Sequence, residues 1–214
     1  MKAHPSPTRS QFICSRGYSL IELLVVITII SILATLAFSA TRAVLAQAYK
    51  VETKIQLAAL EVAVQSYFTE YNRLPGSGTT DETLRLNQST DVLRILLGDA
   101  SGSGQGGAPG IVFLQAKPAK AGRSGLLEHG DNFLSLLDHW GNPYFLILDR
   151  DRDERLSNPD SNNEDRRVSK SASKGLRTRV AAFSSGPDGK PGTGDDIVSW
   201  RLRAYLVDSV RGEG

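Results

Sequence analysis

The chain has 214 residues, a length that favours one compact domain with an additional segment over two full domains. Its 25 basic and 23 acidic side chains give a formal net charge of +2, which argues against the basic excess that nucleic-acid binding requires. Cys14 is the single cysteine, so an intramolecular disulfide is excluded.

Residues 18–40 form an apolar segment in which Glu22 is the only charged side chain. The segment is long enough to cross a hydrocarbon core of about 30 Å. Three other interpretations are a buried core helix, a secretory signal cut after Ser39, and a plain single-pass anchor. Length and position disfavour the core helix, and the early carboxylate disfavours the secretory signal. A plain anchor gives no reason to keep a charge that costs about 2.5 to 3.5 kcal/mol in mid-membrane.

The sequence around Gly17 reads RGYSLIE and is followed by LLVVITIISILATL. This stretch is similar to the prepilin processing site of type IV pilins and pseudopilins. The resemblance implies that a prepilin peptidase cuts after Gly17 and that the new amino terminus, on Tyr18, is methylated. It also implies that Glu22 is the residue that directs assembly.

Elementary electrostatics supports this implied role of Glu22. Cleavage creates a cationic amine at Tyr18 in a low-dielectric setting, where the carboxylate of a neighbouring subunit can neutralise it. Two costly charges then become one neutral contact. The resemblance therefore implies a helical homopolymer that is built through the N-terminal helix.

Residues 41–74 contain neither glycine nor proline and are rich in residues that favour helix. We expect the apolar helix to continue through them, because Pro75 is the first helix breaker. Apolar side chains recur at spacings of three and four and so share one face. They are Leu57, Leu60, Val64, Tyr67 and Tyr71. The pattern indicates a core-facing stripe.

Residues 75–110 alternate loop sequence with a short amphipathic stretch at 92–97, and they end in a glycine-rich run. A GxGxxG string at Gly102, Gly104 and Gly107 does not indicate dinucleotide binding. No buried strand precedes it, and Pro109 stands where a helix should begin.

Four short stretches of the C-terminal half have the composition of strands. They are residues 111–116, 144–149, 180–183 and 197–207. The predicted fold class is therefore α+β, with a long N-terminal helix packed on a small antiparallel sheet. Residues 150–179 are highly charged and indicate a solvated loop.

Residues 138–144 read DHWGNPY, similar to an element of the major pseudopilins of type II secretion. Its Gly-Asn-Pro turn is expected to reverse the chain between a helix and a strand. Trp140 is expected to anchor the packing.

Residues 184–197 alternate turn-forming residues and carboxylates. A Ca²⁺ ion takes six to eight oxygen ligands, and a glycine-rich loop lets carbonyls and carboxylates converge on one point. The stretch resembles the calcium loop of major pseudopilins. The resemblance implies side-chain ligands from Asp188 and one or both of Asp195 and Asp196, completed by Ser184 or Ser185 and nearby carbonyls. A turn-rich hairpin with solvated carboxylates is the alternative.

The remaining chemical groups give no catalytic pattern. Residues 149–154 imitate the start of an EF-hand loop but lack its glycine, which leaves a second cation site as a weaker hypothesis. His4, His129 and His139 are far apart in the sequence, and no nucleophile motif is present. The chain is predicted not to be an enzyme.

The predicted organisation has four parts: a leader peptide of residues 1–17, a transmembrane assembly helix of residues 18–40, its amphipathic continuation over residues 41–74, and a globular domain of residues 75–214. The resemblance implies a single-pass inner-membrane protein with its C-terminal domain in the periplasm. Its partners would be other copies, minor pseudopilins, an inner-membrane assembly platform and the prepilin peptidase.

The function implied is that of a type II secretion pseudopilus subunit that drives export across the outer membrane. Two alternatives stay open. One is a type IV pilus subunit or minor pilin used in adhesion, motility or DNA uptake, and the other is a membrane-anchored calcium-binding domain that never polymerises.

Overall fold

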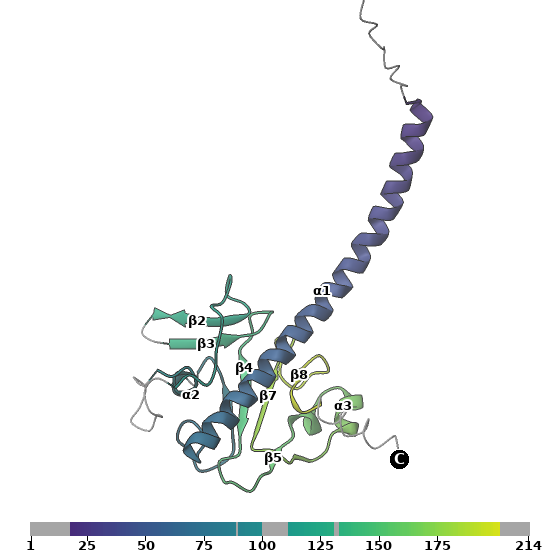
Figure 1. Cartoon of the computed structure of the whole chain (residues 1–214). Helices are drawn as coiled ribbons and strands as arrows, with labels where there is room; N and C mark the ends of the chain where they lie inside the picture. The colour runs from purple at the N-terminus through teal and green to yellow at the C-terminus, as the bar shows by residue number, and fades with distance from the viewer. Residues whose placement is uncertain (1–17, 89, 100–110, 131–132, 202–214) are drawn as a thin grey trace, which may run out of the picture. The chain divides into compact units, whose positions relative to one another are not determined.

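The computed structural model describes residues 18–88, 90–99, 111–130 and 133–201 (Figure 1). The chain divides into two units, residues 1–46 and 47–214. The predicted leader and the glycine-rich run at 100–110 lie outside the described residues.

Helix α1 spans Leu20–Tyr71, which confirms the predicted continuous helix. It ends where Asn72 adopts a left-handed conformation with φ of 50°, and the Asn72 N–H donates to the Phe68 carbonyl at 2.7 Å. This geometry is typical of a helix C-terminus. In the part of the chain that the structure describes, no helix is both long enough and apolar enough to span a membrane.

In the first unit, α1 exposes large apolar side chains all along its described length. These are Leu20, Ile21, Leu23, Leu24, Val25, Val26, Ile27, Ile29, Ile30, Ile32, Leu33, Val44 and Leu45. A helix that is apolar on every side needs an apolar environment or other helices around it.

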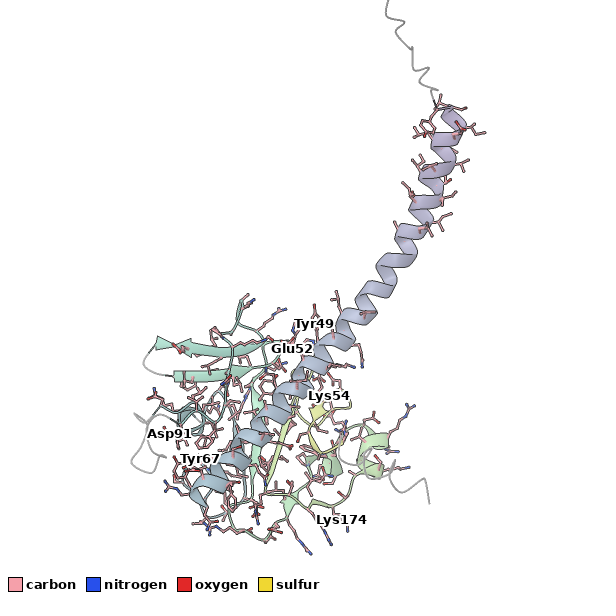
Figure 2. All side chains as sticks on the ribbon, in the orientation of Figure 1. Tyr49, Glu52, Lys54, Tyr67, Asp91 and Lys174 are labelled. Atoms are coloured by element: carbon pink, nitrogen blue, oxygen red, sulfur yellow. The ribbon has the colours of Figure 1, made fainter. Side chains whose placement is uncertain are left out.

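In the second unit, one face of α1 lies in the core. The side chains of Leu57, Leu60, Val64 and Tyr67 are fully buried there, and Tyr71 packs at the edge of the same cluster. Figure 2 labels Tyr67 among the side chains that fill the space beside α1. The predicted core stripe is confirmed.

The main sheet has four antiparallel strands in the order β1-β4-β7-β8. Their bounds are β1 (Glu82–Arg85), β4 (Tyr144–Leu148), β7 (Val180–Ser184) and β8 (Ile197–Val198). Side chains alternate across the strands, so Leu146 and Ala182 join the cluster beneath α1, while Ile147 and Phe183 join a second cluster on the other face. The predicted α+β class, with the helix packed on an antiparallel sheet, is confirmed (Figure 1).

A second hairpin pairs β2 (Gly125–His129) with β3 (Phe133–Leu137), and the short helix α2 (Thr90–Leu96) contacts β3. Helix α2 overlaps the predicted amphipathic stretch at 92–97. The turn at 138–143 joins β3 to β4, so the expected helix before this turn is wrong. Residues 133–137 form a strand because each of them pairs with a residue of β2 in an antiparallel register.

Two strand predictions are also corrected. Residues 111–116 form no strand, since the N–H groups of Phe113 and Leu114 both donate to the Leu96 carbonyl at the end of α2. Strand β8 stops at Val198, and residues 200 and 201 are already helical. The rest of the predicted strand lies outside the described residues.

Residues 150–179 are folded, and the prediction of a solvated loop is wrong. They contain β5 (Leu156–Ser157), the 3-10 helix η2 (Pro159–Asn162), α3 (Arg166–Ser171) and β6 (Gly175–Leu176). Side chains of Asn158 and Asp165 cap the two helices, while Leu156 and Leu176 pack on the outer face of the main sheet. Two buried leucines and local capping therefore order a segment of high charge.

We predict that Leu60→Ala lowers the free energy of unfolding by about 2 to 5 kcal/mol, because Leu60 is fully buried and its truncation leaves a cavity. Val62→Ala on the same helix is the control, since Val62 is 64% exposed. We expect it to change stability by less than about 0.5 kcal/mol. Denaturant unfolding of the detergent-solubilised chain measures both, and equal losses would contradict the assignment of the core face.

Candidate functional site

The start of α1 places Glu22 at the third helical position. The Ser19 N–H donates to Glu22 Oε2 at 2.9 Å, which satisfies a donor that the helix itself leaves open. A carboxylate in the first turn also interacts favourably with the helix dipole. Tyr18 is 89% exposed beside it, whereas Gly17 lies outside the described residues.

The turn at 138–143 and the loop at 184–197 are joined by a buried carboxylate. Asp138 Oδ1 accepts from the N–H groups of Trp140 at 2.9 Å and Asn142 at 2.8 Å, and Asp138 Oδ2 accepts from Ser184 Oγ at 2.6 Å. The Asn142 side chain then donates to the Gly186 carbonyl at 2.8 Å. The two motifs found separately in the sequence thus form one structural unit.

Burial raises the pKa of Asp138, and the hydrogen bonds from Ser184, Asn142 and Trp140 partly offset the effect. Trp140 is partly buried against the core, as expected of a packing anchor. The same turn contacts α1 through His139, whose ring stacks on Tyr49 with centroids 3.4 Å apart. Tyr49 is labelled on α1 in Figure 2.

The first carboxylates of the loop at 184–197 are held by the loop itself. Asp188 Oδ1 accepts from the Lys190 N–H at 2.8 Å, and this bond lowers the pKa of Asp188. Asp195 Oδ2 accepts from the Asp188 N–H at 3.1 Å, and Asp195 Oδ1 accepts from the Thr193 hydroxyl at 2.6 Å. The structure therefore brings Asp188 and Asp195 together.

Asp196 is the carboxylate of the loop that the fold does not satisfy. It is buried, with Oδ2 accepting from the Gly192 N–H at 2.7 Å and Oδ1 making no hydrogen bond. Desolvation raises its pKa to about 6, and repulsion from Asp195 and Asp188 adds to the effect. A buried carboxylate oxygen without a donor is costly, and a bound cation would remove that cost.

The predicted ligand Ser184 is engaged elsewhere. Its hydroxyl donates to Asp138 and accepts from the Gly186 N–H at 3.1 Å. Gly186 has a φ of 62°, and a Cβ at this position would lie 2.5 Å from the Asp195 carbonyl oxygen. Only glycine allows the two ends of the loop to approach this closely.

Residues 158–165 support the loop from the side, which sequence reasoning missed. The Asn163 side chain donates to the Thr193 carbonyl and the Glu164 N–H donates to the Gly192 carbonyl, both at 2.8 Å. Farther along, the buried Asp160 accepts from Trp200 Nε1 at 2.8 Å and forms an ion pair with Arg201. The excess of Asn and Asp in this stretch was the available signal.

Among the described residues, one group of three carboxylates is close enough to hold a metal ion. Ligand atoms of Asp81, Asp149 and Asp151 lie within 4.8 Å of one another. Both oxygens of Asp149 already accept hydrogen bonds, from the N–H groups of Arg152 and Glu154. Burial raises the pKa of Asp149. The sequence indicated the 149–154 string but not Asp81, which the pairing of β1 with β4 brings next to it.

Comparison with known proteins identifies two similarities. Residues 14–38 match the model of the prokaryotic N-terminal methylation motif. The chain is also 26% identical to proteins named type II secretion system core protein G from Aeromonas hydrophila and Escherichia coli K12. These alignments cover 88% and 87% of this chain and 94% and 92% of the relatives.

The chain is thus similar to type IV pilin-like proteins of the major pseudopilin kind. The relative from Klebsiella michiganensis, also named core protein G, is likewise 26% identical over 87% of this chain. No solved structure matches the chain. Pilin-like proteins with this motif are, in general, structural, membrane-anchored proteins of the cell envelope.

We predict that Ser184→Ala lowers the free energy of unfolding by about 1.5 to 3 kcal/mol, because it removes a hydrogen bond to a buried carboxylate. Ser171→Ala is the control, since its hydroxyl is exposed and bonds only to carbonyls of its own helix. We expect a change below about 0.5 kcal/mol there. Equal stabilities of the two variants in urea unfolding would show that the Asp138 contact does not stabilise the fold.

Proposed function

We propose that this chain is a structural subunit of a type II secretion pseudopilus, which assembles through its N-terminal helix and drives protein export across the outer membrane. The observation that carries the proposal is the similarity to proteins named core protein G over 88% of the chain. The methylation motif at residues 14–38 supports it independently. A role in a type IV pilus is less well supported, since the relatives are named for secretion.

The proposed mature chain begins at Tyr18, after a prepilin peptidase removes residues 1–17. Residues 18–40 then serve as the assembly helix and inner-membrane anchor, and the C-terminal domain lies in the periplasm. The exposed apolar surface of α1 in the first unit supports this assignment, because it needs lipid or neighbouring helices to cover it. The proposed partners are other copies, minor pseudopilins and the assembly platform.

Glu22 is proposed as the assembly residue. One of its carboxylate oxygens accepts from the Ser19 N–H of its own helix, which leaves the other available to a neighbour's terminal amine. Neutralising that amine would lower the cost of placing both charges in an apolar filament core.

Mass spectrometry of the mature protein tests whether the chain is processed as a prepilin. We expect an amino terminus at methyl-Tyr18, because the motif match includes Gly17 and Glu22. An intact Met1 on protein isolated from an envelope that contains an active prepilin peptidase would contradict the proposal.

We predict that Glu22→Leu leaves the protein in the membrane and abolishes filaments, since the anchor becomes more apolar while the neighbour's amine loses its partner. Thr28→Ala is the matched control, because it removes a polar group of the same helix without changing charge. Chemical crosslinking with an amine-reactive reagent, followed by gel electrophoresis, measures assembly. Ladders of oligomers as strong as those of the unmodified protein would refute the charge pairing.

We also propose that the loop at 184–197 binds Ca²⁺ and that Asp188, Asp195 and Asp196 supply carboxylate ligands. The unsatisfied, buried Oδ1 of Asp196 supports the fit. The Ser184 hydroxyl is occupied by Asp138, so any contribution from Ser184 would come from its backbone carbonyl. Bound calcium would neutralise charge and tie the turns of the loop together. The group of Asp81, Asp149 and Asp151 remains a second place where a metal ion could bind.

The raised pKa of Asp196 makes the calcium proposal testable through pH. Its pKa is about 6 in the folded chain and near 3.8 in the unfolded chain, so between these values the folded state binds more protons. Without metal, this group therefore destabilises the fold as pH rises through that window. Calcium must displace the proton, so we expect affinity to rise about tenfold from pH 5 to pH 7.

Calorimetric titration with Ca²⁺ at pH 5, 6 and 7 measures this effect, and thermal melts in EDTA and in Ca²⁺ measure the stabilisation. A hundredfold excess over Kd stabilises by about 2.7 kcal/mol. Asp196→Asn should abolish the pH dependence, whereas Glu128→Gln, on the exposed end of β2, should keep it. Identical melting temperatures of the unmodified protein in EDTA and Ca²⁺ would mean that the loop is only a turn.

A further inference from the structure

A polar groove lies between α1 and the hairpin of β5 and β6. It has a volume of about 440 Å³ and is lined by Gln65 on α1 and by residues 153–155 and 177–179 of the hairpin. A second groove of about 190 Å³ shares Arg177 and Thr178 and continues past Glu61. Lys174, labelled in Figure 2, precedes β6 in this hairpin. The two grooves therefore adjoin each other at Arg177 and Thr178.

Arg155 and Arg177 both line the first groove. Arg155 directly precedes β5 and Arg177 directly follows β6, at the end of the hairpin where Leu156 pairs with Leu176. Both arginines are exposed, whereas Leu156 and Leu176 are buried. The hairpin therefore brings two exposed arginines to one groove.

The two carboxylates that line the first groove, Asp153 and Glu154, already make other contacts. Glu154 forms an ion pair with Arg179, whose guanidinium also lies 4.6 Å from the centre of the Phe68 ring. Asp153 Oδ1 accepts from the Arg155 N–H at 2.8 Å. Within the described part of the chain, the guanidinium groups of Arg155 and Arg177 make no ion pair. The two guanidinium groups of this groove are thus available to an external anion.

We propose that the Arg155–Arg177 pair binds the carboxylates of an acidic segment of a partner protein. A guanidinium is planar and forms two parallel hydrogen bonds with a carboxylate, which makes arginine suited to this contact. The groove continues along the hairpin, so it fits an extended chain that carries several carboxylates. This site is separate from the assembly helix and goes beyond the role of a filament subunit.

Fluorescence anisotropy with the full-length, detergent-solubilised protein tests the site. The probe is a labelled peptide of alternating glutamate and glycine, with a lysine-glycine peptide as the negative control. We expect Arg155→Gln combined with Arg177→Gln to weaken binding of the glutamate peptide at least about tenfold. Arg166→Gln combined with Arg167→Gln removes the same charge from the exposed residues of α3, and we expect it to change binding less than about twofold.

Thermal melts supply a second measurement that does not depend on the fluorescent label. The glutamate peptide should raise Tm of the unmodified protein but not of the Arg155 and Arg177 double variant. Equal weakening by both double variants would overturn the proposal, because binding would then follow net charge. Competition by inorganic phosphate at the same concentration as the peptide would also overturn it, because the site would then be one for any oxyanion.

Discussion

The buried carboxylate of Asp138 is the contact on which the arrangement of the C-terminal domain depends. It accepts hydrogen bonds from Trp140, Asn142 and Ser184, and so holds the turn after β3 against the end of β7. Burial of a carboxylate is tolerated only when enough donors surround it. Because those donors come from residues far apart in the sequence, satisfying one charge fixes where the 184–197 loop begins.

The two central strands of the main sheet, β4 and β7, pack against other parts of the domain on both faces. Leu146 and Ala182 face α1, whereas Ile147 and Phe183 face the segment at 150–179, so the central strands are buried on both sides. The same segment supports the 184–197 loop through Asn163 and Glu164. A stretch with the composition of a solvated loop is therefore part of the scaffold around the proposed calcium site.

Charges that the fold leaves uncompensated mark the places where function is proposed. The Oδ1 atom of Asp196 is buried without a hydrogen bond, which is a local cost. The guanidinium groups of Arg155 and Arg177 line one groove and make no ion pair with another described residue. Glu22 is different, since its carboxylate already caps its own helix before any partner arrives. Assembly at Glu22 then adds a contact, while cation binding at Asp196 would relieve an existing cost.

The sequence alone determined the features that depend on local pattern. The helix over 20–71 followed from the absence of Gly and Pro, its core face from the spacing of Leu57, Leu60, Val64 and Tyr67, and β4 and β7 from apolar composition. The similarity to pilins likewise rested on contiguous motifs. Only the tertiary structure placed Asp81 beside Asp149, joined the Ser184 hydroxyl to Asp138 and brought Arg155 and Arg177 to one groove. These contacts depend on strand register and long-range pairing, and no local pattern encodes which distant residue will be opposite.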